Sequence, residues 1–339
     1  MKLLVTGGAG FIGSNFIKYW LQRHSTDTII NLDTLTYAAN PKNLQSETKN
    51  YRENYKLIVG NIANPRKVDD VISSHRPDII VNFAAESHNS RASADPSIFF
   101  RTNVIGTQTL LEAARKTGCS RFHQISTCEV FGDLDLDSTE VFSEDSPYRP
   151  RTPYNASKAG ADMAVRAYFE TFKLPVTIST CCNNYGKYQF PEKLIPLFVT
   201  NLLQDKQVPI YKQSHNRREW LHVLDHCRAI ELILERGVEG ESYNVGSGTE
   251  KSVEEITNHI LEKLGKPQTM KSYVEDRPGH DRRYLLDSSK LKQKLGWEPV
   301  IGFRDGLNDT IEWYAENPDW WKPLLERVEI DERKWAERK

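Results

Sequence analysis

The 339-residue sequence contains no apolar run close to the roughly 20 residues that a membrane-spanning helix needs. Its first segment, Met1 to Gly7, has a basic start, but the apolar run is too short for the hydrophobic part of a signal peptide. Glycines then interrupt that run. We therefore expect a cytoplasmic protein that has no membrane partner.

Cysteine is also scarce. The number of cysteines is odd and no pair has C-x-x-C spacing, so neither a disulfide framework nor a zinc site is indicated. We expect reduced thiols and no metal site; the five cysteines are Cys119, Cys128, Cys181, Cys182 and Cys227.

An excess of charge of either sign is missing as well. The formal net charge is -1, which gives no sign of a surface that binds polyanions and argues against nucleic acid as the main partner. No internal repeat or low-complexity tract interrupts the chain. Its length and its hydrophobic content of 38% suit about two domains, or one large one, with a substantial core.

A strand, a glycine turn and a helix open the chain. Lys2 to Thr6 predicts a buried strand, and Phe11 to Arg23 has helical periodicity. Between them, Gly7 permits a tight turn, Gly10 lets a pyrophosphate approach the backbone, and Gly13 lets the helix pack closely. The segment predicts a dinucleotide site at the helix N-terminus. A glycine-rich turn without a ligand is the alternative.

The second strand of the chain, Thr28 to Leu32, ends at Asp33. A carboxylate there can accept the ribose hydroxyls and repels a 2′-phosphate, which favours NAD over NADP. A capping or turn aspartate is the alternative. Further buried strands at Lys56 to Val59 and Asp78 to Phe83 alternate with helical segments.

The alternation of strands and helices predicts an α/β fold: a doubly wound parallel sheet of the Rossmann type with a smaller mixed α/β substrate domain. We expect residues 1–182 to bind NAD and to carry the catalytic residues. Residues 183–325 would form a substrate-binding domain, partly interleaved with the first, and residues 326–339 a charged tail.

Tyr154 and Lys158 are spaced i, i+4, so they share one face of the helix expected from Pro153. A nearby ammonium stabilises a phenolate and is expected to lower the pKa of the tyrosine. Such a phenolate can take a proton from a sugar hydroxyl while hydride leaves the carbon. Thr127 and Glu129 follow the fifth strand, expected at Arg121 to Ser126, and reach the edge of the sheet where ligands bind.

Several blocks make the chain resemble the extended short-chain dehydrogenase/reductase family, and within it the nucleotide-sugar 4,6-dehydratases. The resemblance extends from the first strand to about Trp313. The matching blocks are Thr6 to Gly13, Ala84 to His88, the Tyr154 motif, Asn183 to Gly186, Phe190 to Leu197 and Arg277 to Tyr284.

The resemblance implies a hydro-lyase that holds NAD tightly and recycles it in each turnover. Tyr154, assisted by Thr127, would take the proton of the C4 hydroxyl while hydride leaves C4. Glu129 would remove the C5 proton, and water would leave from C6. A sugar 4-epimerase, the closest alternative, needs no base at C5, so Glu129 argues for elimination.

The resemblance also assigns binding residues and a homodimer formed through Ser97 to Lys116 and Ser157 to Phe172. Cofactor contacts are expected from Gly7, Gly10, Phe11, Ile12, Gly13, Asp33, Leu35, Thr36, Asn61, Ile62, Ala84, Ala85, Ser87, Thr102, Ser126, Tyr154 and Lys158. Contacts to a UDP- or dTDP-hexose are expected from His88, Asn183, Lys193, Leu194, Pro209, Tyr211, Arg218, Arg277 and His280.

Cys128 departs from the pattern, since the family has an aspartate there that protonates the leaving C6 hydroxyl. A thiol, with an ordinary pKa of about 8.5, is a weaker acid. The sequence then resembles a variant branch that returns hydride to C4 and forms a 5,6-ene sugar from UDP-N-acetylglucosamine. We favour that reaction; the alternatives are dTDP-glucose 4,6-dehydration, epimerisation, and a non-catalytic protein that binds NAD or a nucleotide sugar.

Overall fold

The computed structural model describes residues 1–212, 215–275 and 281–328, so Arg277, His280 and most of the expected tail lie outside the described residues. Within these ranges the main sheet runs in the order β10-β6-β5-β4-β1-β2-β3, and every neighbouring pair is parallel. The expected α/β fold of the Rossmann type is confirmed. Its strands are β1 (Lys2–Thr6), β2 (Thr28–Asp33), β3 (Tyr55–Val59), β4 (Ile79–Asn82), β5 (Arg121–Thr127), β6 (Val176–Cys181) and β10 (Ser242–Val245).

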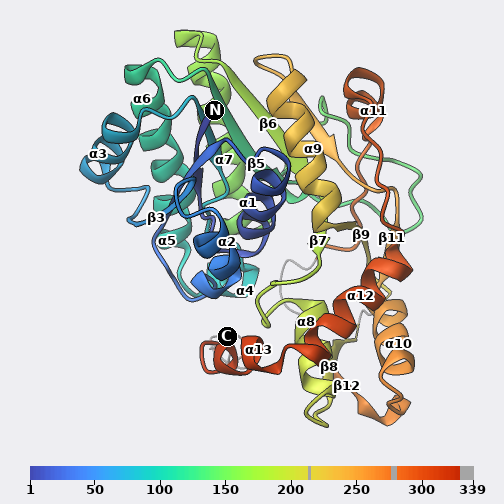
Figure 1. The fold of residues 1–339 in the computed structure, drawn as a ribbon. Helices are drawn as coiled ribbons and strands as arrows, with labels where there is room; N and C mark the ends of the chain where they lie inside the picture. Colours follow the sequence, from blue (N-terminus) through green and yellow to red (C-terminus); the bar gives the residue numbers. More distant parts are fainter. Residues whose placement is uncertain (213–214, 276–280, 329–339) are drawn as a thin grey trace.

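Helices cover both faces of this sheet (Figure 1). They are α1 (Phe11–Arg23), α2 (Gln45–Asn50), α3 (Pro65–His75), α4 (Asn89–Ala94), α5 (Pro96–Phe99), α6 (Thr107–Thr117), α7 (Pro153–Phe172), α9 (Val223–Arg236) and α11 (Ser289–Leu295). Shorter helical turns are η1 (Pro41–Leu44), η2 (Phe100–Gly106) and η3 (Cys128–Phe131).

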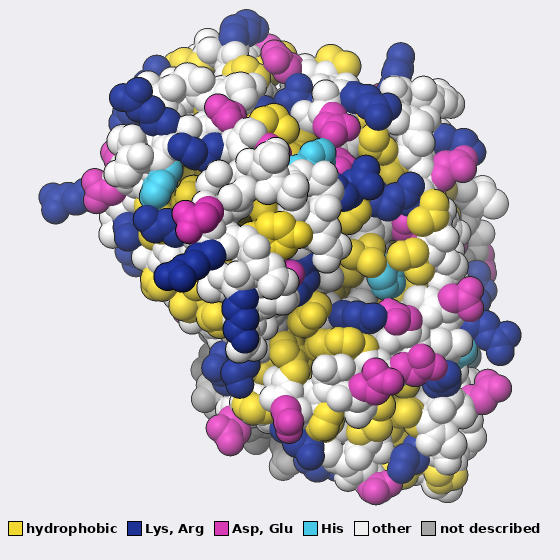
Figure 2. All heavy atoms as spheres, viewed as in Figure 1, with side chains coloured by type: hydrophobic (Ala, Val, Ile, Leu, Met, Phe, Trp, Pro, Cys, Tyr) yellow, Lys and Arg dark blue, Asp and Glu magenta, His cyan; other side chains and the backbone are white. Residues whose placement is uncertain are grey.

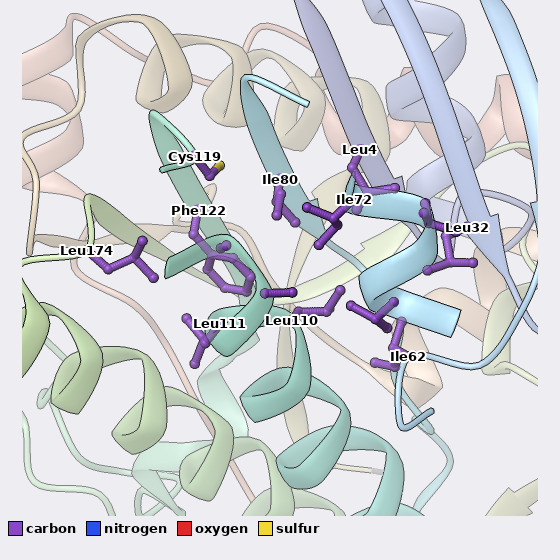
Figure 3. Close-up of a cluster of buried hydrophobic side chains, with 14 of the residues drawn as sticks. Leu4, Leu32, Ile62, Ile72, Ile80, Leu110, Leu111, Cys119, Phe122 and Leu174 are labelled. Carbon is purple, nitrogen blue, oxygen red and sulfur yellow. The ribbon is translucent and has the colours of Figure 1, made fainter. Parts of the chain in front are cut away.

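Alternate residues of each central strand enter different cores, because successive side chains of a strand point to opposite faces. Leu4 packs with side chains of α3 and α6, including Ile72 and Leu110, in the cluster drawn in Figure 3. Leu3 and Val5 pack on the other face against α1 and α9. Both faces are therefore buried, as the continuous apolar runs of these strands predict.

The second, smaller unit is mixed. It contains β7 (Asn183–Tyr185), β8 (Val208–Tyr211), β9 (Arg217–His222), β11 (Glu250–Ser252), β12 (Lys271–Val274), α8 (Leu194–Leu202), α10 (Val253–Lys263), α12 (Phe303–Glu316), α13 (Pro318–Leu325) and η4 (Gln268–Met270). β9 pairs parallel with β7 and antiparallel with β11, while β8 and β12 form a parallel pair. In Figure 1 this unit lies below the main sheet.

Two features of the fold were not predicted from the sequence. β10 comes after β7, β8 and β9 in sequence, yet it extends the main sheet beside β6. The expected interface segment Ser97 to Lys116 is not one continuous α-helix, because the wider π-helical turn η2 separates α5 from α6. Within η2, the side chain of Asn103 bonds both backbone groups of Glu86 and the hydroxyl of Ser157, which fixes the loop after β4.

The surface in Figure 2 carries Lys and Arg side chains interspersed with Asp and Glu, with no large area of one sign on this face. Among the described residues, no helix is long and apolar enough to cross a lipid bilayer.

Candidate active site

A cleft of about 1700 Å³ lies at the carboxyl edge of the main sheet and is lined by residues of both units. The ends of β1, β2, β4, β5 and β6 all reach this edge, where ligands bind in doubly wound sheets. Most of the predicted site residues that the structure describes line this one cleft.

The glycine turn after β1 is shaped by close backbone approach. Gly7 has φ +69°, and a Cβ on it would lie 2.7 Å from the Cα of Ala84. A Cβ on Gly13 would lie 2.5 Å from the carbonyl oxygen of Gly7, so the first turn of α1 rests directly on the loop. Gly10 caps α1 without a side chain, which leaves helix N–H groups open to an anion. This cradle fits a dinucleotide pyrophosphate.

Asp33, at the end of β2, holds the neighbouring loops. Its Oδ2 accepts from the N–H of Ala9 over 2.9 Å and its Oδ1 from the N–H of Leu35 over 2.8 Å. Burial raises the pKa of the Asp33 carboxyl, and these two hydrogen bonds act against that rise. Carboxylate oxygens have further lone pairs for ribose hydroxyls, so the residue fits the adenosine side of NAD.

Leu35 was expected among the cofactor contacts, but its side chain does not line the cleft. Its backbone takes φ +56°, and its N–H turns to Asp33. Leu35 therefore acts through its backbone.

Tyr154 and Lys158 lie on α7, which begins at Pro153 after the capping side chain of Thr152. Burial, followed by the charge of Glu129, raises the pKa of the Tyr154 phenol well above its ordinary value, and a hydrogen bond with Thr127 acts against this. The lowered pKa that the sequence predicted for Tyr154, from the charge of Lys158 alone, is therefore wrong. The ammonium of Lys158 donates to the carbonyl oxygen of Ile125 over 2.5 Å, and burial lowers its pKa.

Glu129 reaches the cleft from η3. Its Oε2 accepts a hydrogen bond of 3.0 Å from the side-chain amide of Asn89, at the start of α4. The carbonyl oxygen of that amide in turn accepts a bond of 2.7 Å from the hydroxyl of Thr152. Neither Asn89 nor Thr152 was predicted from the sequence, because they lie 40 and 23 positions from Glu129 and carry no catalytic motif of their own.

Cys128 does not line the cleft. Its side chain is 1% exposed and packs in an apolar cluster with Val130, Phe131 and Cys182. Burial, followed by the charge of Glu129, raises the pKa of this thiol well above its ordinary value. A thiol that holds its proton so firmly is a poor acid for a leaving hydroxyl.

The predicted substrate residues lie at the other end of the cleft. Lys193 donates to the backbone oxygen of Ser87, and the buried guanidinium of Arg218 lies 4.8 Å from the ring centre of Tyr284. The Tyr284 hydroxyl donates to Asn183 over 2.5 Å. Guanidinium and ammonium groups suit diphosphate oxygens.

A contact between the two units, absent from the predictions, involves Glu192, which lines the cleft. The Glu192 carboxylate accepts from the hydroxyl of Tyr37 over 2.8 Å and from Arg91 over 3.2 Å, and Arg91 stacks on the Tyr37 ring at 3.6 Å. Burial raises the pKa of nearby Glu86. Only the fold brings these distant polar residues together.

Every described residue predicted to bind cofactor or substrate lines the cleft except Leu35, and every catalytic candidate lines it except Cys128. Their individual roles stay predictions.

The comparisons with known proteins all indicate the same family. Residues 4–310 match the family described as GDP-mannose 4,6 dehydratase. The dTDP-glucose 4,6-dehydratase of Streptomyces niveus is 47% identical over 328 residues, covering 96% of each chain. The solved structure of DesIV, a dTDP-glucose 4,6-dehydratase of Streptomyces venezuelae with NAD bound, is 46% identical, with a TM-score of 0.91, and covers 96% of this chain and all of its own.

A solved UDP-glucose 4-epimerase of Thermotoga maritima is also similar, at 28% identity and a TM-score of 0.86 over 94% of this chain and 100% of its own. Identity to the dehydratases is thus much higher than to this epimerase. The names of both dehydratase relatives give dTDP-glucose as their substrate, whereas the sequence of this chain led us to favour UDP-N-acetylglucosamine.

Proposed function

The chain belongs to the GDP-mannose 4,6-dehydratase family of NAD-dependent nucleotide-sugar dehydratases, and we propose that it dehydrates dTDP-glucose to the 4-keto-6-deoxy sugar. The observation that carries this proposal is the placement of Thr127, Glu129, Tyr154 and Lys158 around one cleft, beside a cradle for NAD. A 4-epimerase would have no use for Glu129 in this position.

NAD, when bound, supplies the hydride acceptor for C4 and returns the hydride later in the cycle. Tyr154, in hydrogen-bond contact with Thr127, takes the proton of the C4 hydroxyl. Lys158, held by its hydrogen bond to Ile125, lines the same cleft as Tyr154 and would hold the nicotinamide ribose. Glu129 removes the C5 proton, which the C4 ketone has made acidic.

The 5,6-ene reaction on UDP-N-acetylglucosamine is a second candidate, favoured by Cys128. Its buried thiol does not line the cleft, so no acid stands where the family has an aspartate. In that reaction hydride returns to C4 and the alkene is released. Hydride return to C6 would instead give the product of the first candidate.

The test is incubation of the purified protein with dTDP-glucose and, separately, UDP-N-acetylglucosamine in D2O, followed by NMR. A C6 methyl group beside a C4 ketone or its hydrate supports the first candidate. An exocyclic methylene overturns it and supports the second. Failure to oxidise C4 of either sugar would leave only a binding role.

A homodimer belongs to the same proposal. Exposed apolar side chains gather on the two predicted interface helices: Ile98, Phe100, Ile105, Met163 and Phe172 are each at least 42% exposed. A cytoplasmic location is also part of the proposal. Sedimentation at micromolar concentration, compared between wild type and Ile105→Asp, tests the dimer.

A further inference from the structure

The hydrogen bonds around Glu129 form a directed chain. The N–H of Asn155 donates to the Thr152 hydroxyl over 3.2 Å, and that hydroxyl donates to Asn89 over 2.7 Å. Asn89 then donates to Oε2 of Glu129 over 3.0 Å. An ionised carboxylate can only accept, so the amide must present its NH2 group to Glu129 and its oxygen to Thr152. The donor and acceptor of each hydrogen bond are therefore fixed by the hydrogen bond next to it.

These hydrogen bonds link α7 and η3, the two elements that carry Tyr154 and Glu129. Thr152 caps α7, the helix of Tyr154, and α4 packs against α7. Glu129 lies on η3. Its backbone N–H donates a 3.3 Å hydrogen bond to the hydroxyl of Thr127, which fixes the start of η3. Asn89 thus holds the carboxylate in a set position relative to the phenol.

An amide neither takes nor releases a proton near neutral pH, so Oε2 cannot pass a proton to Asn89. Among the described residues, no hydrogen-bond donor is recorded on Oε1 of Glu129. Cys128 is buried away from the cleft and offers no second acid there. The elimination needs two proton transfers, and Oε1 is the oxygen of Glu129 that Asn89 leaves open for both.

We propose that Asn89, oriented by Thr152, is a positioning residue that reserves Oε1 of Glu129 to act first as base at C5 and then as acid at C6. This inference rests on the proposed function and holds for either of its products. Oε1 takes the C5 proton, the C5–H electron pair forms the C5=C6 bond, and the C6–O bond breaks. The departing oxygen takes the same proton from Oε1 and leaves as water, and Glu129 is again a carboxylate.

The test compares C4 oxidation with later steps in single turnovers of dTDP-glucose, with UDP-N-acetylglucosamine run in parallel. Absorbance at 340 nm follows C4 oxidation, and NMR in D2O follows C5 exchange and water loss. Asn89→Leu removes the amide at similar volume, and Asn89→Ala is a smaller variant should leucine disturb folding. Thr152→Ser keeps both the hydroxyl and the helix cap. Ser93→Ala, one turn along α4, is the matched control, because within the described ranges the Ser93 hydroxyl bonds only to the backbone oxygen of Asn89.

In both Asn89 variants we expect C5 exchange and water loss to slow by roughly 10- to 100-fold, because a displaced base loses its alignment. The 340 nm signal should form at the wild-type rate and then persist. Thr152→Ser and Ser93→Ala should behave as wild type.

Two results would overturn the inference. Wild-type C5 exchange in folded Asn89 variants would show that the amide does not position the base. An equal slowing of C4 oxidation and C5 exchange would indicate a merely structural role. If the wild type itself oxidises neither sugar, the proposed function fails, and that outcome is distinct from both.

Discussion

The Nζ atom of Lys158 lies 2.5 Å from the carbonyl oxygen of Ile125, which joins the catalytic helix α7 to the strand that ends in Thr127. Lys158→Met would remove this bond and the charge while keeping most of the side-chain volume. We expect C4 oxidation to slow at least about 100-fold, within the range of proton-transfer catalysis. Stopped-flow absorbance at 340 nm measures it, with exposed Lys116→Met as control. A loss below threefold, with an unchanged Tm, would exclude a role for the ammonium.

The pH dependence of C4 oxidation should reflect Tyr154. Since burial raises the pKa of its phenol, the phenolate fraction and the rate should increase with pH from 6 to 9. Thr127→Val removes a hydrogen bond that lowers this pKa, so the rate at pH 7 should fall by roughly tenfold per unit of pKa change. The deficit should narrow in alkali, and Thr127→Ser should restore the profile. A deficit of equal size at every pH would contradict this account.

Substitution of Cys128 should have little effect on the reaction. If its thiol supplied the acid, removal would cost roughly 10²- to 10⁴-fold in kcat. We expect Cys128→Ala and Cys128→Ser to lower kcat less than about tenfold, together with a stability loss of about 1 kcal/mol from the small cavity. Steady-state kinetics and thermal unfolding separate the two effects. A loss of 100-fold in folded Cys128→Ala would identify the thiol as the acid.

Substitution of Gly13 should affect stability, whereas substitution of Gly10 should affect NAD binding. A Cβ on Gly13 meets the Gly7 oxygen at 2.5 Å, so Gly13→Ala should cost about 1–3 kcal/mol of stability. A Cβ on Gly10 meets its nearest atom only at 3.3 Å, so Gly10→Ala should fold but lose bound NAD. The NAD released per chain on denaturation, and the Tm, distinguish them. Gly302→Ala, whose nearest neighbour would be 3.8 Å away, is the control.

Glu219 should make stability depend on pH. Burial raises the pKa of its carboxyl to about 7, while its unfolded value is about 4.3. The native state therefore binds more protons between these values, and Glu219 favours folding less as pH rises from about 4 to 7. Between pH 5 and 8 this group alone should lower the free energy of unfolding by about 3 kcal/mol. Urea unfolding at both pH values measures it. Glu219→Gln should show a smaller decrease than wild type, and an equal decrease would exclude Glu219 as the source.

The sequence predicted the main sheet well because its signals are local. The first strand and helix were placed at their observed bounds, Lys2–Thr6 and Phe11–Arg23, by an apolar run, glycines and a 3.6-residue period. The NAD cradle followed from the same segment. The direction of Cys128 could not be read, since it depends on how η3 turns the chain after Thr127. The Asn89–Glu129 bond joins two elements through the tertiary fold alone.

The late position of β10 affects how the chain can be made and divided. A ribosome that has completed residues 1–182 has produced six of the seven strands, yet β6 still has an open edge. Its partner emerges only after β7, β8 and β9, so this sheet cannot be completed before much of the smaller unit has been synthesised. A chain cut at residue 182 would expose unpaired N–H and C=O groups along β6 and be prone to aggregate. Division of this protein into separately expressed halves requires that β10 be carried with the first.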